Sequence, residues 1–563
     1  MENRKHPPSA STGAFAHSLR AMLFLFPFLF GLYYEFSLFL AGVCLCVWLL
    51  CFFRKHQSLR IPRTIPALCL AVLLLCYAGS CFYAVDQGLA STGVLRLLPV
   101  VLFFIAWNQL EPTEQSSCRA ALPYTGTAMT LIAVPAYLFP ACRNFFYRAD
   151  RLGGFFQYSN AFALFLLLGV VLTASRDTVQ KRELALSTVL LAGILLTGSR
   201  GVFLLTLLAL AVLFVRKKAL RRPILIALAC ILICGVAFVS ITGSFQNIGR
   251  FLTISGQSST LWGRLLYDLD GLSLLRSQPF GLGYLGYAYI QPQIQSGVYS
   301  ARFIHNDYLQ TALDAGLLAG IAFAALPLYG LFSRRTGRAE RLCLLLMALY
   351  FLFDLGIEFS YLFFVLLLLL PQGSVWTIRR LPPLRVCTVA LGCLLLYGSV
   401  AFGMEYAGNF AAAVRLYPGN TSARESLMQQ AKNPDDAEAL AEEILARNRY
   451  SVAAWDMKAL TAAVRRDYEA MVDYKQQTLS IARYSVSEYE DYIFLLKRAI
   501  EFYQETGDVT SKETYVELAL RVPDQLAALR AQTSPLAFQL RDQPQFELSK
   551  EVQDYLKSLE TGG

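Results

Sequence analysis

The strongest constraint on this fold is a series of apolar runs that covers most of the first 404 residues. The runs fall at about 15–33, 36–53, 65–83, 89–107, 120–140, 155–175, 184–198, 201–215, 223–242, 308–332, 341–355, 359–377 and 386–404. Each is close to the ~20 residues that a helix needs to cross a bilayer. With 55% hydrophobic and 16% charged residues among 563, the chain cannot be one soluble domain. We expect an all-α, polytopic membrane domain of about 13 transmembrane helices over residues 1–404.

The basic clusters between these runs give the orientation. Counted alternately from a cytoplasmic N-terminus, they all fall on one side, which the positive-inside rule makes the cytoplasm. The clusters are Arg54-Lys55, Lys181-Arg182, Arg216-Lys-Lys218, Arg221-Arg222, Arg334-Arg335 and Arg379-Arg380. The net charge of +10 reflects this distribution and not one basic face, so no nucleic-acid partner is expected. The loop at about 243–307 and the tail 405–563 then lie outside the plasma membrane.

The tail has a different composition and a weak internal repeat. Tyr450-Ser-Val452, followed by Trp455, recurs 34 residues later as Tyr484-Ser-Val486, followed by Tyr489. That is the period of a tetratricopeptide (TPR) helical hairpin, and Asp467-Tyr-Glu-Ala470 fits the start of a repeat helix. An irregular helical bundle is the alternative. Either arrangement predicts an extracytoplasmic α-helical surface on which a protein partner or a glycan docks.

Several arginines fall on the outer side, against the positive-inside pattern. Arg200 lies in a tight turn between two apolar runs, Arg151 precedes the sixth run, and Arg264 and Arg302 lie in the external loop. An arginine at the end of a short hydrophobic hairpin is costly and needs an anionic partner. Because the guanidinium binds phosphate oxygens in a bidentate manner, this cluster suits a lipid-linked phosphate or diphosphate. The alternatives are a salt bridge from Arg264 to Asp268 and contact of Arg302 with membrane lipid headgroups.

His305 is the candidate catalytic base. His6, His17 and His56 fall on the cytoplasmic side, whereas His305 is external and immediately precedes Asn306 and Asp307, which are helix N-cap residue types. The positive end of a helix dipole disfavours imidazolium, which suits a neutral base near pH 7. A lone histidine at such a place is more often structural, but the external arginines favour a catalytic role. Asp307 has two candidate roles, orienting the imidazole or capping the helix.

Other patterns carry less weight. Asp268-Leu-Asp270 resembles a metal-binding pair, but it lies in a stretch with helical spacing, where carboxylates at i and i+2 point to different faces. Pro279-Phe-Gly-Leu-Gly283 follows no strand and lacks the Lys-Ser/Thr of a P-loop, so it predicts a turn. The 13 cysteines lie mostly within apolar runs, where they act as small apolar side chains. We expect no metal, no cofactor and no disulfide.

Four blocks together resemble the O-antigen ligase family, part of the Wzy polymerase superfamily of membrane proteins. They are Arg151–Asn160, Thr197–Gly201, Gly263-Arg264 with Gln278–Gly283, and His305-Asn306 with Gly316. The resemblance implies a GT-C-like glycosyltransferase that moves a glycan from a polyprenyl (undecaprenyl) diphosphate to an acceptor hydroxyl outside the membrane, without a metal. By motif, Arg200 and Arg264 would hold the diphosphate and His305 would be the base. Arg151 and Asn160 match more loosely, and Arg302 has no fixed position in the family pattern.

The resulting hypothesis is an inverting glycan transferase of the cell envelope that resembles O-antigen ligases. Its acceptor would be a glycan, a lipid or a wall polymer. Two alternatives stay open. A polymerase would join lipid-linked repeat units by the same chemistry, and the motifs do not separate it from a ligase. A lipid or polysaccharide transporter would use the external arginines as a headgroup-binding vestibule, but paired half-helices of the transporter kind are not visible in the sequence.

Overall fold

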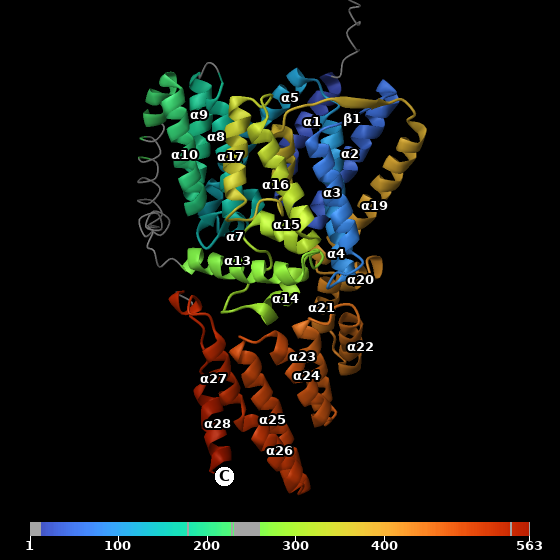
Figure 1. The fold of residues 1–563 in the computed structure, drawn as a ribbon, viewed down its shortest axis with the longest axis vertical. Helices are drawn as coiled ribbons and strands as arrows, with labels where there is room; N and C mark the ends of the chain where they lie inside the picture. Colours follow the sequence, from blue (N-terminus) through green and yellow to red (C-terminus); the bar gives the residue numbers. More distant parts are fainter. Residues whose placement is uncertain are drawn as a thin grey trace, which may run out of the picture.

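The structure, a computed structural model, describes residues 13–176, 180–226, 229, 233, 259–540 and 543–561. It is all-α, with an apolar helical bundle at one end and a helical tail at the other (Figure 1). The bundle helices are α1 (Gly13–Leu25), α2 (Glu35–His56), α3 (Ile65–Ser80), α4 (Gln87–Trp107), α5 (Pro112–Arg119), α6 (Ala121–Ala133), α7 (Pro140–Phe146), α8 (Ser159–Ala174), α9 (Lys181–Leu196), α10 (Arg200–Arg216), α15 (Asp307–Ala315), α16 (Leu317–Phe332), α17 (Arg338–Tyr350), α18 (Ser360–Leu369) and α19 (Pro382–Tyr406).

The apolar runs of the sequence become helices of this bundle. Among the described helices, α2, α4 and α19 are long and apolar enough to cross a membrane, and shorter apolar helices include α3, α8, α16 and α18. The chain is therefore a helical membrane protein, while the number of spans and their orientation stay predictions. The ninth predicted span, 223–242, and the start of the external loop, 243–258, lie largely outside the described residues.

The core of the bundle lies around α8 and α18. Nearly every side chain of α8 and all of those of α18 are buried, as expected for helices that are apolar on every face. Two short antiparallel pairs are present among the described residues, and the first joins distant segments while the second is a local hairpin. β1 (Leu59–Pro62) pairs with β4 (Val375–Ile378), and β2 (Tyr147–Arg148) pairs with β3 (Arg151–Leu152).

The predicted span at 308–332 is broken into two helices. Gly316 ends α15 with φ 92° and separates it from α16. A β-carbon at Gly316 would lie 2.7 Å from the Phe280 carbonyl oxygen, so only glycine fits the contact with the Pro279–Gly283 segment. That segment is a turn, as predicted. Its Leu282 and Gly283 amides donate to carbonyls of α15, and Leu317 donates back to Pro279.

Two helices lie across the end of the bundle, between it and the tail (Figure 1). They are α13 (Ser259–Ser277), which carries Arg264, and α14 (Gly286–Ile294). The tail consists of α20 (Phe410–Leu416), α21 (Thr421–Gln429), α22 (Pro434–Leu445), α23 (Val452–Val464), α24 (Tyr468–Ile481), α25 (Val486–Thr506), α26 (Val509–Leu520), α27 (Val522–Gln532) and α28 (Lys550–Glu560).

The tail preserves the spacing found in its sequence. The α22–α23 hairpin is followed by the α24–α25 hairpin, whose helices start 34 residues later. Asp467 caps α24 by accepting a hydrogen bond from the Ala470 amide at 3.2 Å, which confirms the predicted helix start. The identification of the repeat as tetratricopeptide stays a prediction.

The end of the tail folds back onto the transverse helices. The Ser534 amide donates to the Ser296 carbonyl at 2.9 Å. Beyond it, a 3-10 turn, η6 (Ala537–Gln539), buries Ala537 and Leu540 against Leu266 of α13. The tail is therefore in contact with the helix that carries Arg264, an arrangement that the sequence does not predict.

Candidate active site

A buried carboxylate, Asp354, gathers three of the residues that the sequence singled out. Its Oδ2 accepts hydrogen bonds from Arg264 Nη2 at 3.0 Å and Asn160 Nδ2 at 2.5 Å. Its Oδ1 accepts from the Tyr158 hydroxyl at 2.5 Å and from the Leu355 amide at 2.9 Å. Arg151 Nη2 in turn donates to Asn160 Oδ1 at 2.6 Å. We call Arg151, Tyr158, Asn160, Arg264 and Asp354 the Asp354 corner.

The residues of this corner lie on different elements. Arg151 is held in the β2–β3 hairpin, and its Nε donates to the Thr197 carbonyl at 2.9 Å. Asn160 lies in the first turn of α8, Arg264 on α13, and Asp354 in the turn between α17 and α18. The predicted pair between Arg264 and Asp268 is not the one that forms, because α13 turns Arg264 toward Asp354, which is 2% exposed.

Arg200 lies next to the corner. It is the first residue of α10, three positions after the Thr197 carbonyl that holds Arg151. The following Gly201 packs so closely on Phe353 that a β-carbon there would lie 2.5 Å from the ring. The start of α10 therefore abuts the turn that presents Asp354. The structure thus brings Arg151, Asn160 and Arg264 together and places the start of α10, with Arg200, next to them.

His305 lies beside the corner with a free ring nitrogen. Its ring and the Tyr267 ring are tilted by 36°, with centroids 5.5 Å apart. His305 Nδ1 is buried and has no hydrogen-bond partner among the described residues. Burial lowers the pKa of the imidazole below its usual value of 6.5, the Asp354 carboxylate raises it, and Arg264 lowers it, with a net lowering. The imidazole is therefore neutral near pH 7, as a general base requires.

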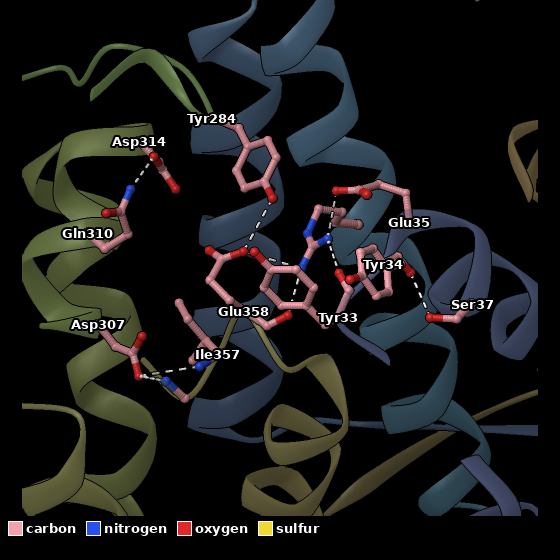
Figure 2. A network of polar contacts seen from close by, with 12 residues as sticks. Tyr33, Tyr34, Glu35, Ser37, Tyr284, Asp307, Gln310, Asp314, Ile357 and Glu358 are labelled. Carbon is pink, nitrogen blue, oxygen red and sulfur yellow. Dashed lines mark hydrogen bonds and ion pairs between the residues drawn. The ribbon is translucent and has the colours of Figure 1, made fainter. Parts of the chain in front are cut away.

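Asn306 and Asp307 have structural roles. Asn306 caps α15, because its Oδ1 accepts from the Leu309 amide at 3.1 Å. Asp307 is the first residue of the helix, and its Oδ2 accepts from the Gly356 and Ile357 amides at 2.7 and 3.3 Å (Figure 2). Of the two roles left open for Asp307, the structure shows neither a cap nor a hydrogen bond to the imidazole. Asp307 instead fixes the turn that carries Asp354.

The Asp268–Asp270 pair is divided between two environments. Asp270 Oδ2 accepts from the Ser296 amide at 2.9 Å and the Tyr299 hydroxyl at 2.8 Å, which fixes the loop after α14. Burial raises the pKa of Asp268 to about 6, although nearby Arg264 lowers it. Over the described parts of the chain, no three His, Cys, Asp or Glu side chains are grouped so as to hold a metal ion.

A second buried network surrounds Arg96 in the middle of α4. Arg96 pairs with Glu35 at 2.9 Å and Glu358 at 3.3 Å, and Tyr284 donates to Glu358 at 3.2 Å (Figure 2). Arg302 lines the same cavity as Arg96, Glu35 and Tyr284, and its guanidinium lies 5.7 Å from the centroid of the Phe303 ring. The structure therefore separates Arg302 from the other external arginines, although it is only three residues from His305.

Asp354, Glu358 and Arg96 were not among the residues that the sequence patterns singled out. Asp354 falls at the end of the apolar run 341–355, Glu358 falls between that run and the run 359–377, and Arg96 falls inside the run 89–107. The signal was present, because a charge within or between apolar spans must be paired in the protein interior. Arginines on the outer side predict ion pairs with carboxylates on the same side, and Asp354 and Glu358 are carboxylates at that side.

Comparison with known families agrees with the sequence motifs. Residues 185–324 match the family model described as O-antigen ligase. The match includes Arg200, Arg264 and His305, and it leaves out Arg151, Asn160, Asp354 and the tail. It confirms the resemblance to the O-antigen ligase and Wzy superfamily and supports a membrane protein that processes glycans. No curated protein has significant similarity to the chain.

Proposed function

We propose that the protein transfers a saccharide from a polyprenyl diphosphate carrier to an acceptor hydroxyl outside the cytoplasmic membrane. The observation that carries the proposal is the placement of a neutral imidazole, His305, beside an arginine-rich corner; its Nδ1 has no hydrogen-bond partner among the described residues. Arg264 is held there by the buried carboxylate of Asp354. A preorganised guanidinium next to a base suits a substrate with a diphosphate leaving group.

Asp354 orients the Arg264 side chain for a substrate. A guanidinium has five N–H donors, and the Asp354 carboxylate takes one of those on Arg264. The carboxylate fixes the direction of the side chain while the remaining donors stay available for diphosphate oxygens. Positioning of this kind, completed before the reaction, is what makes electrostatic stabilisation of a leaving group effective.

The reaction then needs two groups from the protein. His305 accepts the proton of the acceptor hydroxyl while its oxygen attacks the anomeric carbon of the donor sugar. The bond between that carbon and the phosphate oxygen breaks, and the electron pair leaves with the diphosphate, whose charge Arg264 and Arg200 stabilise. A diphosphate is already a good leaving group, so a general acid is not required. Attack opposite the leaving group inverts the anomeric centre.

Replacement of His305 by alanine tests this proposal. In proteoliposomes with a polyprenyl-diphosphate-linked glycan and an acceptor, His305→Ala should lower transfer by about 10²–10⁴-fold, the usual contribution of a general base. Donor binding should stay nearly unchanged, whereas Arg264→Ala or Arg200→Ala should weaken it. His17, which is exposed on α1, supplies the matched control His17→Ala. Transfer by His305→Ala at the wild-type rate would show that the base is wrongly assigned.

Two further measurements refine the proposal. A membrane-impermeant thiol reagent should label His305→Cys from outside the cell, and labelling only from the inside would exclude the reaction. The product size distinguishes the two acceptor classes, since a ligase adds its glycan once and a polymerase gives a ladder. The O-antigen ligase match does not separate these two outcomes.

A further inference from the structure

An aromatic cavity lies on the far side of the segment that carries His305. Its volume is about 170 Å³, and its lining includes Tyr33, Tyr34, Tyr284, Arg302, Glu405 and Tyr406. Arg302 and Phe303 form part of its wall, whereas His305, two residues after Phe303, faces the Asp354 corner. We call this space the aromatic cavity.

The aromatic rings of the cavity present both flat faces and hydroxyl groups. The Tyr34 and Tyr406 rings meet edge to face with centroids 4.9 Å apart, and the Tyr33 and Tyr34 rings do so at 5.2 Å. Tyr406 is 50% exposed, so the cavity is open at this ring. Apolar ring faces beside polar groups suit an amphipathic ligand. A pyranose is such a ligand, because its C–H face stacks on aromatic rings and its hydroxyls form hydrogen bonds.

The charge of the cavity distinguishes it from the Asp354 corner. Arg96 and Arg302 are balanced by Glu35 and Glu405 in its lining, whereas the corner is built around the ion pair of Arg264 with Asp354. Arg302 is exposed, and across the described residues its guanidinium forms no hydrogen bond or ion pair. Because the lining is balanced and one strong donor group is free, the cavity suits an uncharged polyol better than a phosphate.

Two short segments connect the cavity with the corner. The turn 354–358 begins with Asp354, which holds Arg264, and ends with Glu358, which holds Arg96 beside the cavity. The segment 302–305 begins with Arg302 in the cavity wall and ends with the proposed base. At ~3.3 Å per residue, His305 lies at most about 10 Å along the chain from Arg302. A short oligosaccharide spans that length.

We propose that the aromatic cavity binds the sugar residues of the acceptor, next to the hydroxyl that His305 deprotonates. The donor diphosphate would occupy the Asp354 corner, and the acceptor would approach from the opposite side of the imidazole. This inference rests on the proposed function for the direction of transfer, but saccharide binding in the cavity can be measured without any reaction.

The test uses the full-length protein in nanodiscs and two substitutions in the cavity. The probe is the free, uncharged oligosaccharide released from the envelope polysaccharide of the source cells, with binding followed by saturation-transfer NMR. Tyr406→Ala and Arg302→Gln should each raise the Kd at least about tenfold, as the loss of a stacking face or a charge-assisted hydrogen bond does. Both side chains are exposed, so neither substitution opens the core.

The matched control is Phe82→Ala. Phe82 is 86% exposed in the turn after α3, at the same end of the bundle, and it does not line the cavity. If the aromatic rings merely anchor the protein at the membrane surface, the control will weaken binding as much as Tyr406→Ala, which would overturn the inference. Absence of binding to the wild-type protein would also overturn it.

Kinetics separate the acceptor from the donor. Tyr406→Ala and Arg302→Gln should raise the KM for the acceptor and leave the KM for the lipid-linked donor unchanged. A rise confined to the donor KM would overturn the assignment to the acceptor. His305→Ala should abolish transfer and retain oligosaccharide binding. If the wild-type protein binds the oligosaccharide but transfers nothing, the proposed function fails and the saccharide site remains.

Discussion

Replacement of Asp354 by asparagine tests the central contact of the candidate site. All four partners of the carboxylate, Arg264, Asn160, Tyr158 and the Leu355 amide, act as hydrogen-bond donors to it. An asparagine has the same shape but carries an NH₂ group. Whichever way the amide is turned, this group faces donors, and the guanidinium of Arg264 loses its counterion. The substitution therefore removes a charge and a hydrogen bond without creating a cavity.

The free-energy cost of Asp354→Asn follows from the burial of the ion pair between Arg264 and Asp354. Removing one partner of a buried ion pair costs about 3–5 kcal/mol. The side chain of Arg264 is 19% exposed, so water recovers part of this cost, and we expect about 2–3 kcal/mol. Because this free energy holds Arg264 in position for the donor, it sets the scale of the effect on catalysis. At ~1.36 kcal/mol per factor of ten, kcat/KM should fall about 30–150-fold.

A double-mutant cycle gives the sharpest measurement. We expect Asp354→Asn and Arg264→Gln to couple by about 1–3 kcal/mol in kcat/KM measured in proteoliposomes, because each removes the same ion pair. Asp270→Asn is the control, since Asp270 accepts hydrogen bonds from Ser296 and Tyr299 and pairs with no arginine of the described residues. Thermal unfolding of each variant separates misfolding from a local effect. Effects of the two substitutions that add within ~0.5 kcal/mol would refute the reasoning.

Two further predictions concern the base and the tail. The kcat/KM of the wild-type protein should rise with pH through an apparent pKa below 6.5, because His305 acts when neutral and burial lowers its pKa. In the Arg264→Gln variant this rise should move to higher pH, because Arg264 lowers the pKa of His305. A pH–rate profile in which the rise does not move would contradict the assignment of His305 as the base. Ala537→Arg should lower kcat/KM at least about tenfold, because Ala537 is 0% exposed between the tail and α13 and a buried unpaired charge costs several kcal/mol. The control Ala531→Arg, at an exposed position of α27, should have no effect in the same transfer assay. Equal rates for both variants would show that the tail does not position Arg264.

The sequence predicts the helices well and their three-dimensional contacts poorly. Apolar runs report what must be buried, so the limits of α2, α4 and α19 agree closely with the predicted spans. Local capping rules also placed the starts of α15 and α24. The break at Gly316 was not predicted, because it depends on the approach of the Phe280 carbonyl, a contact between segments whose proximity no periodicity reveals.

In the candidate site, too, single residues could be predicted from the sequence, whereas their contacts could not. Residue type and side of the membrane selected Arg200, Arg264 and His305, because a guanidinium or imidazole at an external turn is unusual enough to notice. Asp354 was missed although it is the residue that brings Arg264 and Asn160 together. A single carboxylate in a turn gives no pattern by itself, and its importance appears only when its partners from α8 and α13 are in place.

The start of α15 and the turn 354–358 lie next to His305 and separate the two proposed substrate sites. Asp307, at the start of α15, fixes the turn 354–358 through the Gly356 and Ile357 amides, so the helix after His305 and the turn that carries Asp354 and Glu358 form one unit. That unit faces the Asp354 corner on one side and the charge-balanced aromatic cavity on the other. A single substitution at Asp307 would disturb both faces together, whereas Asp354→Asn and Tyr406→Ala each disturb one. Selective loss of donor binding in the first and of acceptor binding in the second therefore follows from the geometry. This selectivity distinguishes a transferase with two substrate subsites from a protein that only binds lipid headgroups.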